Sequence, residues 1–337
     1  MLSTRHYTIP VFIPELACPF QCAFCNQQKI SGQLHIPDHE EIINTINEYL
    51  NSFTADKRYV EVGFFGGSFT GINIDEQRKY LETVQPFLQN GQVQSIRLST
   101  RPEYISNEIL DVLKEMNVGT IELGAQSFDD GVLKNSIRGH SSAQIEKAAA
   151  MIRSYGFKLG LQMMIGLPGD TFEKAMYTAG MIVKNGADNT RIYPALVIKD
   201  TLMHKWFIEG KYKPLSMDEA ILWTSRILLF FEQNNINIIR VGLHPSEGLV
   251  SGDELIAGPF HPSFKELVLS HIWRENLENQ VSVISNDSIT IEVNPKEINH
   301  AIGYEKINKL WLLEKYRNVS FVQKPVLKGR NFKILES

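Results

Sequence analysis

Three cysteines lie within eight consecutive residues, and they are the only cysteines among 337 residues. Cys18, Cys22 and Cys25 are separated by three and then by two residues. Three thiols cannot close a disulfide framework, and clustered thiols are more often metal ligands or catalysts. Zinc would need a fourth ligand, and the nearby His35 and His39 flank a predicted helix start and are expected on the surface. The spacing suits a loop around one face of a [4Fe–4S] cluster, which leaves one iron without a protein ligand.

With Phe24 just before the last cysteine, this motif resembles the signature of the radical S-adenosylmethionine (SAM) superfamily. The resemblance implies that Cys18, Cys22 and Cys25 hold the cluster and that its open iron binds the amino and carboxylate groups of SAM. It also implies reductive cleavage of SAM to methionine and a 5'-deoxyadenosyl radical, chemistry that the cofactor supplies. Two alternatives stay open, a noncatalytic metal-binding module and free cysteines with an accidental spacing.

Strand-like segments alternate with amphipathic segments of helical period over the first two hundred residues. Such alternation predicts parallel strands joined by crossover helices. We expect an α/β fold, a partial (β/α)6 TIM-like barrel, with a doubly wound sheet as the alternative. The predicted strands are 11–14, 58–65, 93–100, 118–127, 158–169 and 189–197, and the predicted helices are 37–50, 74–88, 106–116, 142–156 and 171–183.

Small or polar residues follow each predicted strand. The carboxyl ends of parallel strands meet at one edge, so we expect a ring of hydrogen-bonding groups there. The turn "GLPGD" lacks the lysine and the spacing of a P-loop, and we expect Asp170 to cap the following helix. The ring residues predicted from the sequence are Gly66, Gly67, Ser68, Ser99, Thr100, Arg101, Glu122, Gln126, Arg138, His140, Gln162, Arg191 and Tyr193.

Five segments resemble the catalytic core of the Elongator catalytic subunit family, radical SAM enzymes of wobble-uridine tRNA modification. These segments are "GFFGGSFTGI", "GAQSFDDGVL", "IRGHS", "MIGLPGDT" and "RIYPALVIKDTLMHKWFIEGKYKP". The resemblance covers roughly residues 8–265 and extends more loosely to oxygen-independent coproporphyrinogen oxidases. We expect none of the Elongator family's acetyltransferase domain here, so acetyl-CoA chemistry is not transferred to this chain.

The resemblance also assigns roles to individual residues. It implies that the methionyl amino group of SAM is held by one turn and that its ribose and carboxylate side is lined by four strand-end residues. We expect Tyr193 and Lys199 to face the same opening and contact substrate, under a loop around His244. The implied cofactor-binding residues are Gly66, Gly67 and Ser68 in the turn, and Ser99, Gln126, Arg138 and Gln162 at the strand ends.

The last fifty residues predict a separate small module. Their strand, short helix, Gly303 turn, longer helix and strand resemble the βααβ core of a KH module, although Lys306 replaces the second glycine of the GXXG turn. Residues 295–335 carry nine Lys or Arg against three Glu, which suits the binding of RNA phosphates; the alternative is a small packing domain with a solvated basic face. We expect a radical SAM core at 1–265 and an α+β module at 266–337. The cationic residues considered are Lys296, Lys306, Lys309, Lys315, Lys324, Lys328, Arg330 and Lys333.

Two sequence patterns, for membrane spanning and for secretion, bear on where the protein is located. No apolar run is long enough to span a bilayer, and the N-terminus lacks the pattern of a secretory signal, so we expect a cytoplasmic protein without membrane contact. The expected substrate is tRNA or another RNA, with a small molecule such as a tetrapyrrole as the alternative. The implied chemistry needs an external reductant such as flavodoxin or ferredoxin.

Overall fold

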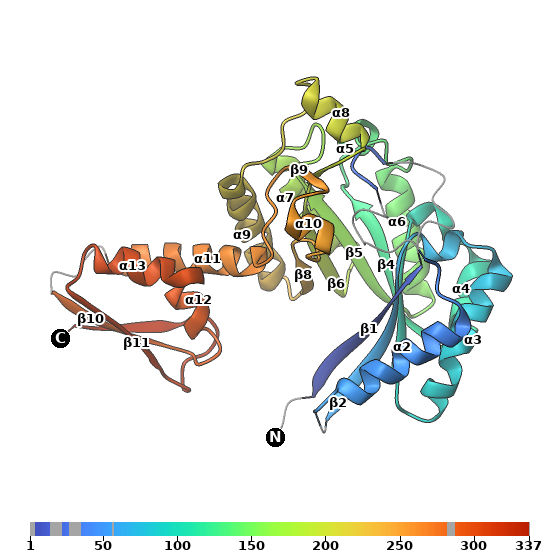
Figure 1. Ribbon diagram of the computed structural model, residues 1–337, viewed down its shortest axis with the longest axis horizontal. Helices are drawn as coiled ribbons and strands as arrows, with labels where there is room; N and C mark the ends of the chain where they lie inside the picture. The colour runs from blue at the N-terminus through green and yellow to red at the C-terminus, as the bar shows by residue number, and fades with distance from the viewer. Residues whose placement is uncertain (1–3, 14–21, 27–34, 56, 282–286, 337) are drawn as a thin grey trace.

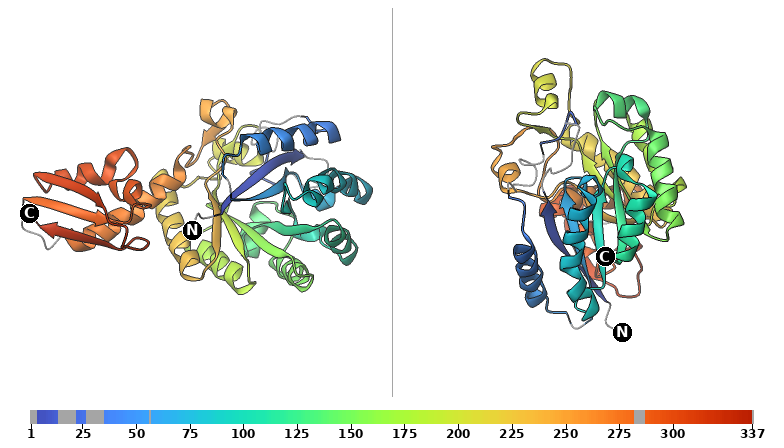
Figure 2. Two further views of the ribbon diagram at one scale, coloured as in Figure 1. Left: turned by 90° about the horizontal axis from the view of Figure 1, so that it is seen from below. Right: turned by 90° about the vertical axis from the view of Figure 1, so that its right-hand side faces the viewer.

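The computed structural model describes residues 4–13, 22–26, 35–55, 57–281 and 287–336. Its larger part is a curled sheet of parallel strands with helices along the outer side (Figures 1 and 2).

The sheet confirms the expected partial TIM-like barrel. Each strand pairs in parallel with the next, and the sheet stays open at its two edge strands. In sheet order the strands are β1 (Arg5–Ile13), β2 (Arg58–Gly66), β3 (Ser95–Thr100), β4 (Val118–Gln126), β5 (Lys158–Ile165), β6 (Asn189–Pro194) and β8 (Asn237–Val241).

Crossover helices connect these strands and cover the convex face (Figure 2). Their N-termini carry the expected caps, for example the reciprocal capping box between Ser141 and Gln144. The main crossover helices are α2 (His39–Ser52), α3 (Ile74–Gln89), α4 (Asn107–Glu115), α6 (Ser142–Ser154), α7 (Phe172–Lys184) and α9 (Met217–Gln233). Shorter elements near the strand C-termini are α5 (Asp130–Asn135), α8 (Leu202–Ile208), α10 (Glu247–Ser251) and the β7 (Val197–Ile198) and β9 (Leu255–Ala257) ribbon.

The two faces of the sheet differ in chemistry because side chains alternate along each strand. In β4, Ile121 and Leu123 are fully buried in the main hydrophobic core with the helices. Glu122, between them, turns to the concave side and contacts charged residues of β3 and β6. The concave face is therefore polar, and it is the face on which chemistry can take place.

The sequence prediction missed the seventh strand, β8. This strand is short and only partly buried apart from Val241, so it lacks the strong apolar signal of the central strands. It pairs with β6, which places Arg240 opposite Arg191. The predicted strands at 158–169 and 189–197 also run too far. Gly166 has a φ of +75° and ends β5 in a turn, whereas β6 ends at Pro194 and Val197–Ile198 forms the separate strand β7.

The C-terminal module has the predicted order of elements plus one further strand. Strand β10 is central, parallel to β11 and antiparallel to β12. The Gly303 turn is held against the long helix Phe264–Val281, since the Tyr304 amide donates to Ser270 Oγ at 2.8 Å. The elements are β10 (Ser288–Val293), α12 (Ile298–Ile302), a 3-10 turn at Tyr304–Lys306, α13 (Ile307–Leu313), β11 (Asn318–Gln323) and β12 (Phe332–Glu336).

Helix α11 (Phe264–Val281) belongs to both hydrophobic cores. Its first half, including Val268, packs in the barrel core, and its second half, including Trp273 and Leu277, packs in the module core. Figure 1 shows this helix running from the barrel into the module. In the described part of the chain, no helix is long and apolar enough to cross a membrane.

Candidate active site at the strand ends

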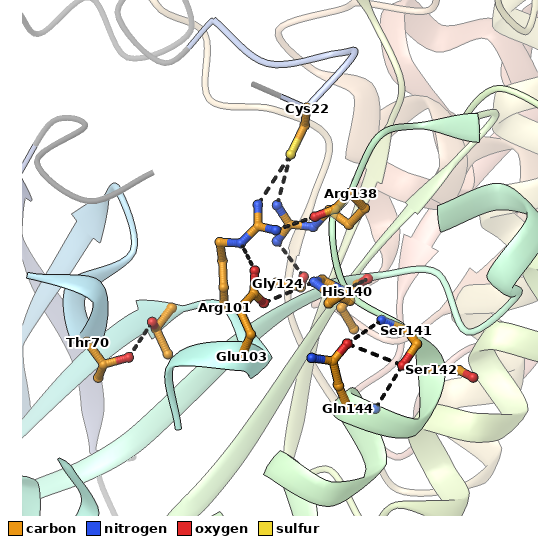
Figure 3. Close-up of polar contacts among 12 residues, drawn as sticks. Cys22, Thr70, Arg101, Glu103, Gly124, Arg138, His140, Ser141, Ser142 and Gln144 are labelled. Carbon is orange, nitrogen blue, oxygen red and sulfur yellow. Dashed lines mark hydrogen bonds and ion pairs between the residues drawn. The ribbon is translucent and has the colours of Figure 1, made fainter. Parts of the chain in front are cut away.

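Two adjacent guanidinium groups contact the sulfur of Cys22 at the C-terminal edge of the sheet (Figure 3). Arg138 Nη1 donates to Cys22 Sγ at 3.2 Å, and Arg101 Nη1 donates to the same atom at 3.4 Å. All three residues are buried, with exposures of 4% for Cys22, 2% for Arg101 and 7% for Arg138. Positive charge beside a sulfur stabilises the thiolate, which is the form in which cysteine binds a metal.

Backbone contacts fix the position of the cysteine segment. The Ala23 amide donates to the Ser136 carbonyl at 3.0 Å, and the Ala23 carbonyl accepts from the Met203 amide at 2.8 Å. The segment is thereby tied to the end of α5 and to the start of α8. Phe24, which the family signature includes, is 9% exposed and packs in the same small hydrophobic cluster as Met203.

Arg101 is oriented by a carboxylate and a histidine (Figure 3). Its Nε donates to Glu103 Oε1 at 2.5 Å, and Glu103 Oε2 lies 3.2 Å from His140 Nδ1. Burial by itself would raise the pKa of Glu103, but the hydrogen bond with His140 and the charge of Arg101 lower it to about 2. Burial lowers the pKa of His140. At neutral pH an ionised Glu103 and a neutral imidazole therefore hold the guanidinium toward Cys22.

Arg138 Nε and Gln126 Oε1 are among the buried polar atoms at this site that have no hydrogen-bond partner among the described residues. Arg138 Nη1 donates to Cys22 and Nη2 donates to the Gly124 carbonyl at 2.7 Å, whereas Nε has no acceptor among the described residues and is a spare donor. Gln126 ends β4 with a left-handed φ of 67°, a conformation that non-glycine residues adopt rarely and often at functional sites. A spare donor and a spare acceptor near one thiol fit a ligand that carries both a carboxylate and an ammonium group.

The glycine turn after β2 has a structural reason as well as a predicted ligand. Gly66 has a φ of +110°, and a Cβ there would lie 2.8 Å from the Ile13 carbonyl oxygen. The Gly67 amide donates to that same oxygen at 2.9 Å. The turn thus holds the end of β2 against the end of β1, just before the cysteine segment. Ser68, which follows, is buried at 4% exposure.

Glu122 connects three residues of the concave face. It accepts from Arg191 Nε at 2.6 Å, from Arg97 Nη1 at 2.7 Å and from Gln162 Nε2 at 2.9 Å. Burial would raise the pKa of Glu122, but Arg191 and then Arg97 lower it. Gln162 is therefore held by its amide nitrogen. Arg97, which the sequence pattern did not single out, bonds also to Glu61, with Nη2 at 3.0 Å.

The remaining predicted residues divide between the concave face and the rim. Ser99 is next to Glu122 in the register of β3 and β4, on the concave side. Tyr193 is two residues beyond Arg191 on β6 and interacts electrostatically with it, while burial raises the pKa of the phenol. Lys199 lies after β7 and is exposed, and its amide donates to the Glu254 carbonyl at 2.9 Å.

Of the three cysteines, Cys18 lies outside the described residues, whereas Cys25 is partly buried and its amide donates to the Cys22 carbonyl at 3.0 Å. Within the described ranges no three His, Cys, Asp or Glu side chains form a metal-binding group. His35 and His39 are exposed, as predicted. His35 Nε2 is 2.8 Å from Glu41 Oε2, and the other imidazole bonds to a threonine.

Two family models match consecutive parts of the sequence. The radical SAM superfamily model matches residues 13–182, and the radical SAM C-terminal domain model matches residues 187–274. The chain belongs to the radical SAM superfamily. Enzymes of this superfamily use a [4Fe–4S] cluster and S-adenosylmethionine, and this chain is a radical SAM enzyme.

Similar proteins include RNA-modifying and haem-related members of the superfamily. The tRNA uridine(34) acetyltransferase of Dehalococcoides mccartyi is 24% identical over 61% of this chain and 52% of its own length. The heme chaperone HemW of Bacillus subtilis is 24% identical over 61% of this chain and 54% of its own length. The structure of Methanocaldococcus infernus Elp3 aligns with a TM-score of 0.66 at 20% identity, over 81% of this chain and 64% of that one. The chain thus spans only part of the length of these relatives.

Proposed function

We propose that this radical SAM enzyme modifies RNA, with tRNA as its substrate. The observation that carries the SAM-dependent chemistry is the contact of Cys22 with both Arg101 and Arg138 at the strand C-termini, where neighbouring buried atoms without partners among the described residues fit SAM. The choice of tRNA is supported by relatives named tRNA uridine(34) acetyltransferase. Acetyl transfer is not part of the proposal.

Cys18, Cys22 and Cys25 would hold the [4Fe–4S] cluster. When bound, the cluster and SAM supply reductive cleavage of the sulfonium and a 5'-deoxyadenosyl radical for hydrogen abstraction. Arg138 Nε would donate to the methionyl carboxylate. Gln126 Oε1 would accept from the methionyl ammonium, which differs from the ribose and carboxylate side that the resemblance implies for this residue. These contacts would give partners to two of the buried atoms that lack one among the described residues.

The other assigned residues would position the nucleoside part of SAM and the substrate. Gln162 is held by its amide nitrogen on Glu122, which leaves its oxygen to accept from a ribose hydroxyl. Ser99 on β3, which is opposite Glu122 of β4, would donate its hydroxyl to the nucleoside part of SAM. The turn of Gly66, Gly67 and Ser68 would approach the methionyl amino group. Tyr193 and Lys199 would contact the substrate.

Two parts of the chain, an RNA partner and an electron donor complete the proposed function. We divide the chain into a radical SAM core at 1–265 and a C-terminal module at 266–337, with α11 shared between their hydrophobic cores. The basic residues of the module would bind RNA phosphates. A reducing compartment suits a thiolate-bound cluster, so we place the enzyme in the cytoplasm with flavodoxin or ferredoxin as electron donor.

A second candidate is a radical SAM enzyme that acts on a tetrapyrrole. It is favoured by the similarity to the heme chaperone HemW, which matches as much of this chain as the tRNA-modifying relative of Dehalococcoides does. The module would then have a packing role only.

The experiment has two parts. Protein purified and reconstituted without oxygen should hold four irons and release 5'-deoxyadenosine from SAM under dithionite. A protein that binds no iron or leaves SAM intact contradicts the assignment of the cluster. The nucleoside profile of tRNA from cells that lack the gene should then lose one modified nucleoside, and an unchanged profile with altered haem intermediates would favour the second candidate.

A further inference from the structure

Arg240 on β8 differs from the other arginines of the concave face. It lies opposite Arg191 in the register of β6 and β8 and is partly buried. Its Nε donates to the Gly242 carbonyl at 3.1 Å, and its Nη2 donates to His244 Nδ1 at 3.2 Å. Within the part of the chain that the structure describes, Arg240 forms no ion pair with a carboxylate.

The neighbouring arginines are neutralised. Glu61 and Glu122 share Arg97, and Glu122 accepts two hydrogen bonds from Arg191. Of the three arginines Arg97, Arg191 and Arg240, Arg240 is therefore the one whose positive charge has no carboxylate partner among the described residues. A partly buried charge without a counter-ion is unfavourable, and burial together with Arg191 lowers the pKa of Arg240. An anionic ligand would remove this cost.

Two further donors lie beside this guanidinium. His244 accepts from Arg240 through Nδ1, so its proton is on Nε2, and burial followed by the charge of Arg240 lowers the pKa of the imidazole. His244 is exposed at the start of the loop before α10. Tyr193 lies two residues beyond Arg191 on β6, on the same face of the strand, and Arg191 is the residue that Arg240 faces in the register, so Tyr193 contributes a phenolic hydroxyl on this side of the sheet. A cation, an imidazole N–H and a hydroxyl together match the acceptor oxygens of a phosphate or carboxylate.

We infer that Arg240, with His244 and Tyr193, binds an oxyanion of the substrate at the β8 edge of the concave face. The inference rests on the proposed function, because that function places the substrate on this face. For an RNA substrate the oxyanion is the phosphate beside the target nucleoside, and for a tetrapyrrole it is a carboxylate. The site is separate from the pair of arginines at Cys22, which follow β3 and α5.

The test measures binding by the reconstituted full-length enzyme at low ionic strength. The probes are uridine 5'-monophosphate, uridine, inorganic phosphate and coproporphyrin III. The variants are Arg240→Gln and Arg240→Lys, with Arg226→Gln as the matched control because Arg226 is an exposed arginine on α9 paired with Glu275. Thermal melting checks that each variant is folded.

The wild type should bind uridine 5'-monophosphate more tightly than uridine, and Arg240→Gln should remove this difference by weakening only the phosphate-bearing probe. A charged hydrogen bond contributes about 1.5–3 kcal/mol, which corresponds to a weakening of about 10- to 100-fold. Arg240→Lys should retain part of the affinity, and Arg226→Gln should retain all of it. If Arg240→Gln does not fold, the lysine variant tests the same weakening.

Other results separate the possible outcomes. A weakening confined to coproporphyrin III supports an oxyanion site but overturns the choice of RNA. Equal affinity of the Arg240 variants and the wild type for every probe overturns the inference, as does binding of inorganic phosphate alone. Release of 5'-deoxyadenosine by the wild type is measured separately, so a failure of the proposed function is distinguishable from a failure of this site.

Discussion

Arg101 and Arg138 both donate to Cys22, but only Arg138 keeps a donor free. Arg101 is occupied by Glu103 and by the Arg138 carbonyl, whereas Arg138 Nε has no partner among the described residues. We therefore expect the two arginines to have different roles. Arg101 positions the thiol, and Arg138 has a donor left for the cofactor.

Arg138→Gln should retain the cluster and weaken SAM binding by about 10- to 100-fold, because it removes one charged hydrogen bond to the methionyl carboxylate. Iron content and the visible spectrum check the cluster, and equilibrium dialysis with labelled SAM measures the affinity. The exposed Arg226→Gln variant serves as control. Unchanged SAM affinity in a folded Arg138→Gln protein would show that the spare donor faces something else.

Cys22→Ser should abolish cluster assembly, since the hydroxyl is a poor substitute for a thiolate ligand. The purified variant should be colourless after anaerobic reconstitution, and it should release no 5'-deoxyadenosine. Thermal melting of the cluster-free wild type gives the reference for folding. A Cys22→Ser protein with the full iron content would remove this residue from the ligand set.

Glu122→Gln should lower the free energy of unfolding by about 3 kcal/mol, because it leaves the charges of Arg97 and Arg191 without their shared carboxylate. Chemical denaturation measures the change. The control is Glu115→Gln, which removes an exposed ion pair with Arg78 and should change stability by less than about 1 kcal/mol. Equal effects of the two substitutions would mean that the buried network contributes little.

At the scale of elements, the turn after β5 shows that local sequence did not predict the correct N-cap residue of α7. Asp170 was expected to cap α7, but Thr171 is the N-cap, and its side chain accepts from the Lys174 amide. Asp170 instead accepts from the amides of Gly166 and Thr171, at 2.9 and 3.0 Å. Both residues suit an N-cap in sequence. Which of them takes the position depends on the turn geometry set by Gly166.

The burial of Asp170 predicts a pH effect. Burial raises its pKa to about 7, although the two backbone amides oppose this. Between about pH 4 and 7 the folded state keeps a proton that the unfolded state has released, so stability should fall as pH rises through this window. One proton corresponds to a slope of up to about 1.4 kcal/mol per pH unit. Asp170→Asn should flatten the curve of unfolding free energy against pH, and parallel curves for both proteins would contradict the assignment.

The sequence was sufficient for the alternation of strands and helices, for parallel pairing and for the residues at the strand ends, because these depend on period and on chain order, but it left a doubly wound sheet open. It was not sufficient for contacts between distant segments. Arg97 and Glu122 are adjacent only after β3 and β4 pair, and the spacing of the cysteines does not show that Arg101 meets Cys22. Strand β8 was missed since its buried signal is weak, and with it Arg240.

At the scale of the whole molecule, the module is joined to the barrel by α11 and by an ion pair. Arg330, one of the predicted phosphate-binding residues, donates to both oxygens of Glu232 on α9, at 2.6 and 2.9 Å. This residue is therefore engaged within the protein. Removing the module at 266–337 would also remove Val268 and Ile272 of α11 from the barrel core, so a deletion would disturb the barrel as well.

Charge neutralisation tests RNA binding without that disturbance. Lys306 is exposed in the Gly303 turn, and Lys309 is partly exposed on α13. If both lysines bind tRNA phosphates, Lys306→Gln/Lys309→Gln should weaken tRNA binding. The slope of log affinity against log salt should also become shallower, by about 0.7–0.9 for each phosphate that the variant no longer neutralises.

The matched control replaces the exposed Lys147 and Lys184 on α6 and α7, where no weakening is expected. Filter binding over roughly 50 to 200 mM salt measures both quantities. Identical slopes for the module variant and the wild type would assign the module to packing, because a protein that neutralises fewer phosphates must release fewer counterions on binding.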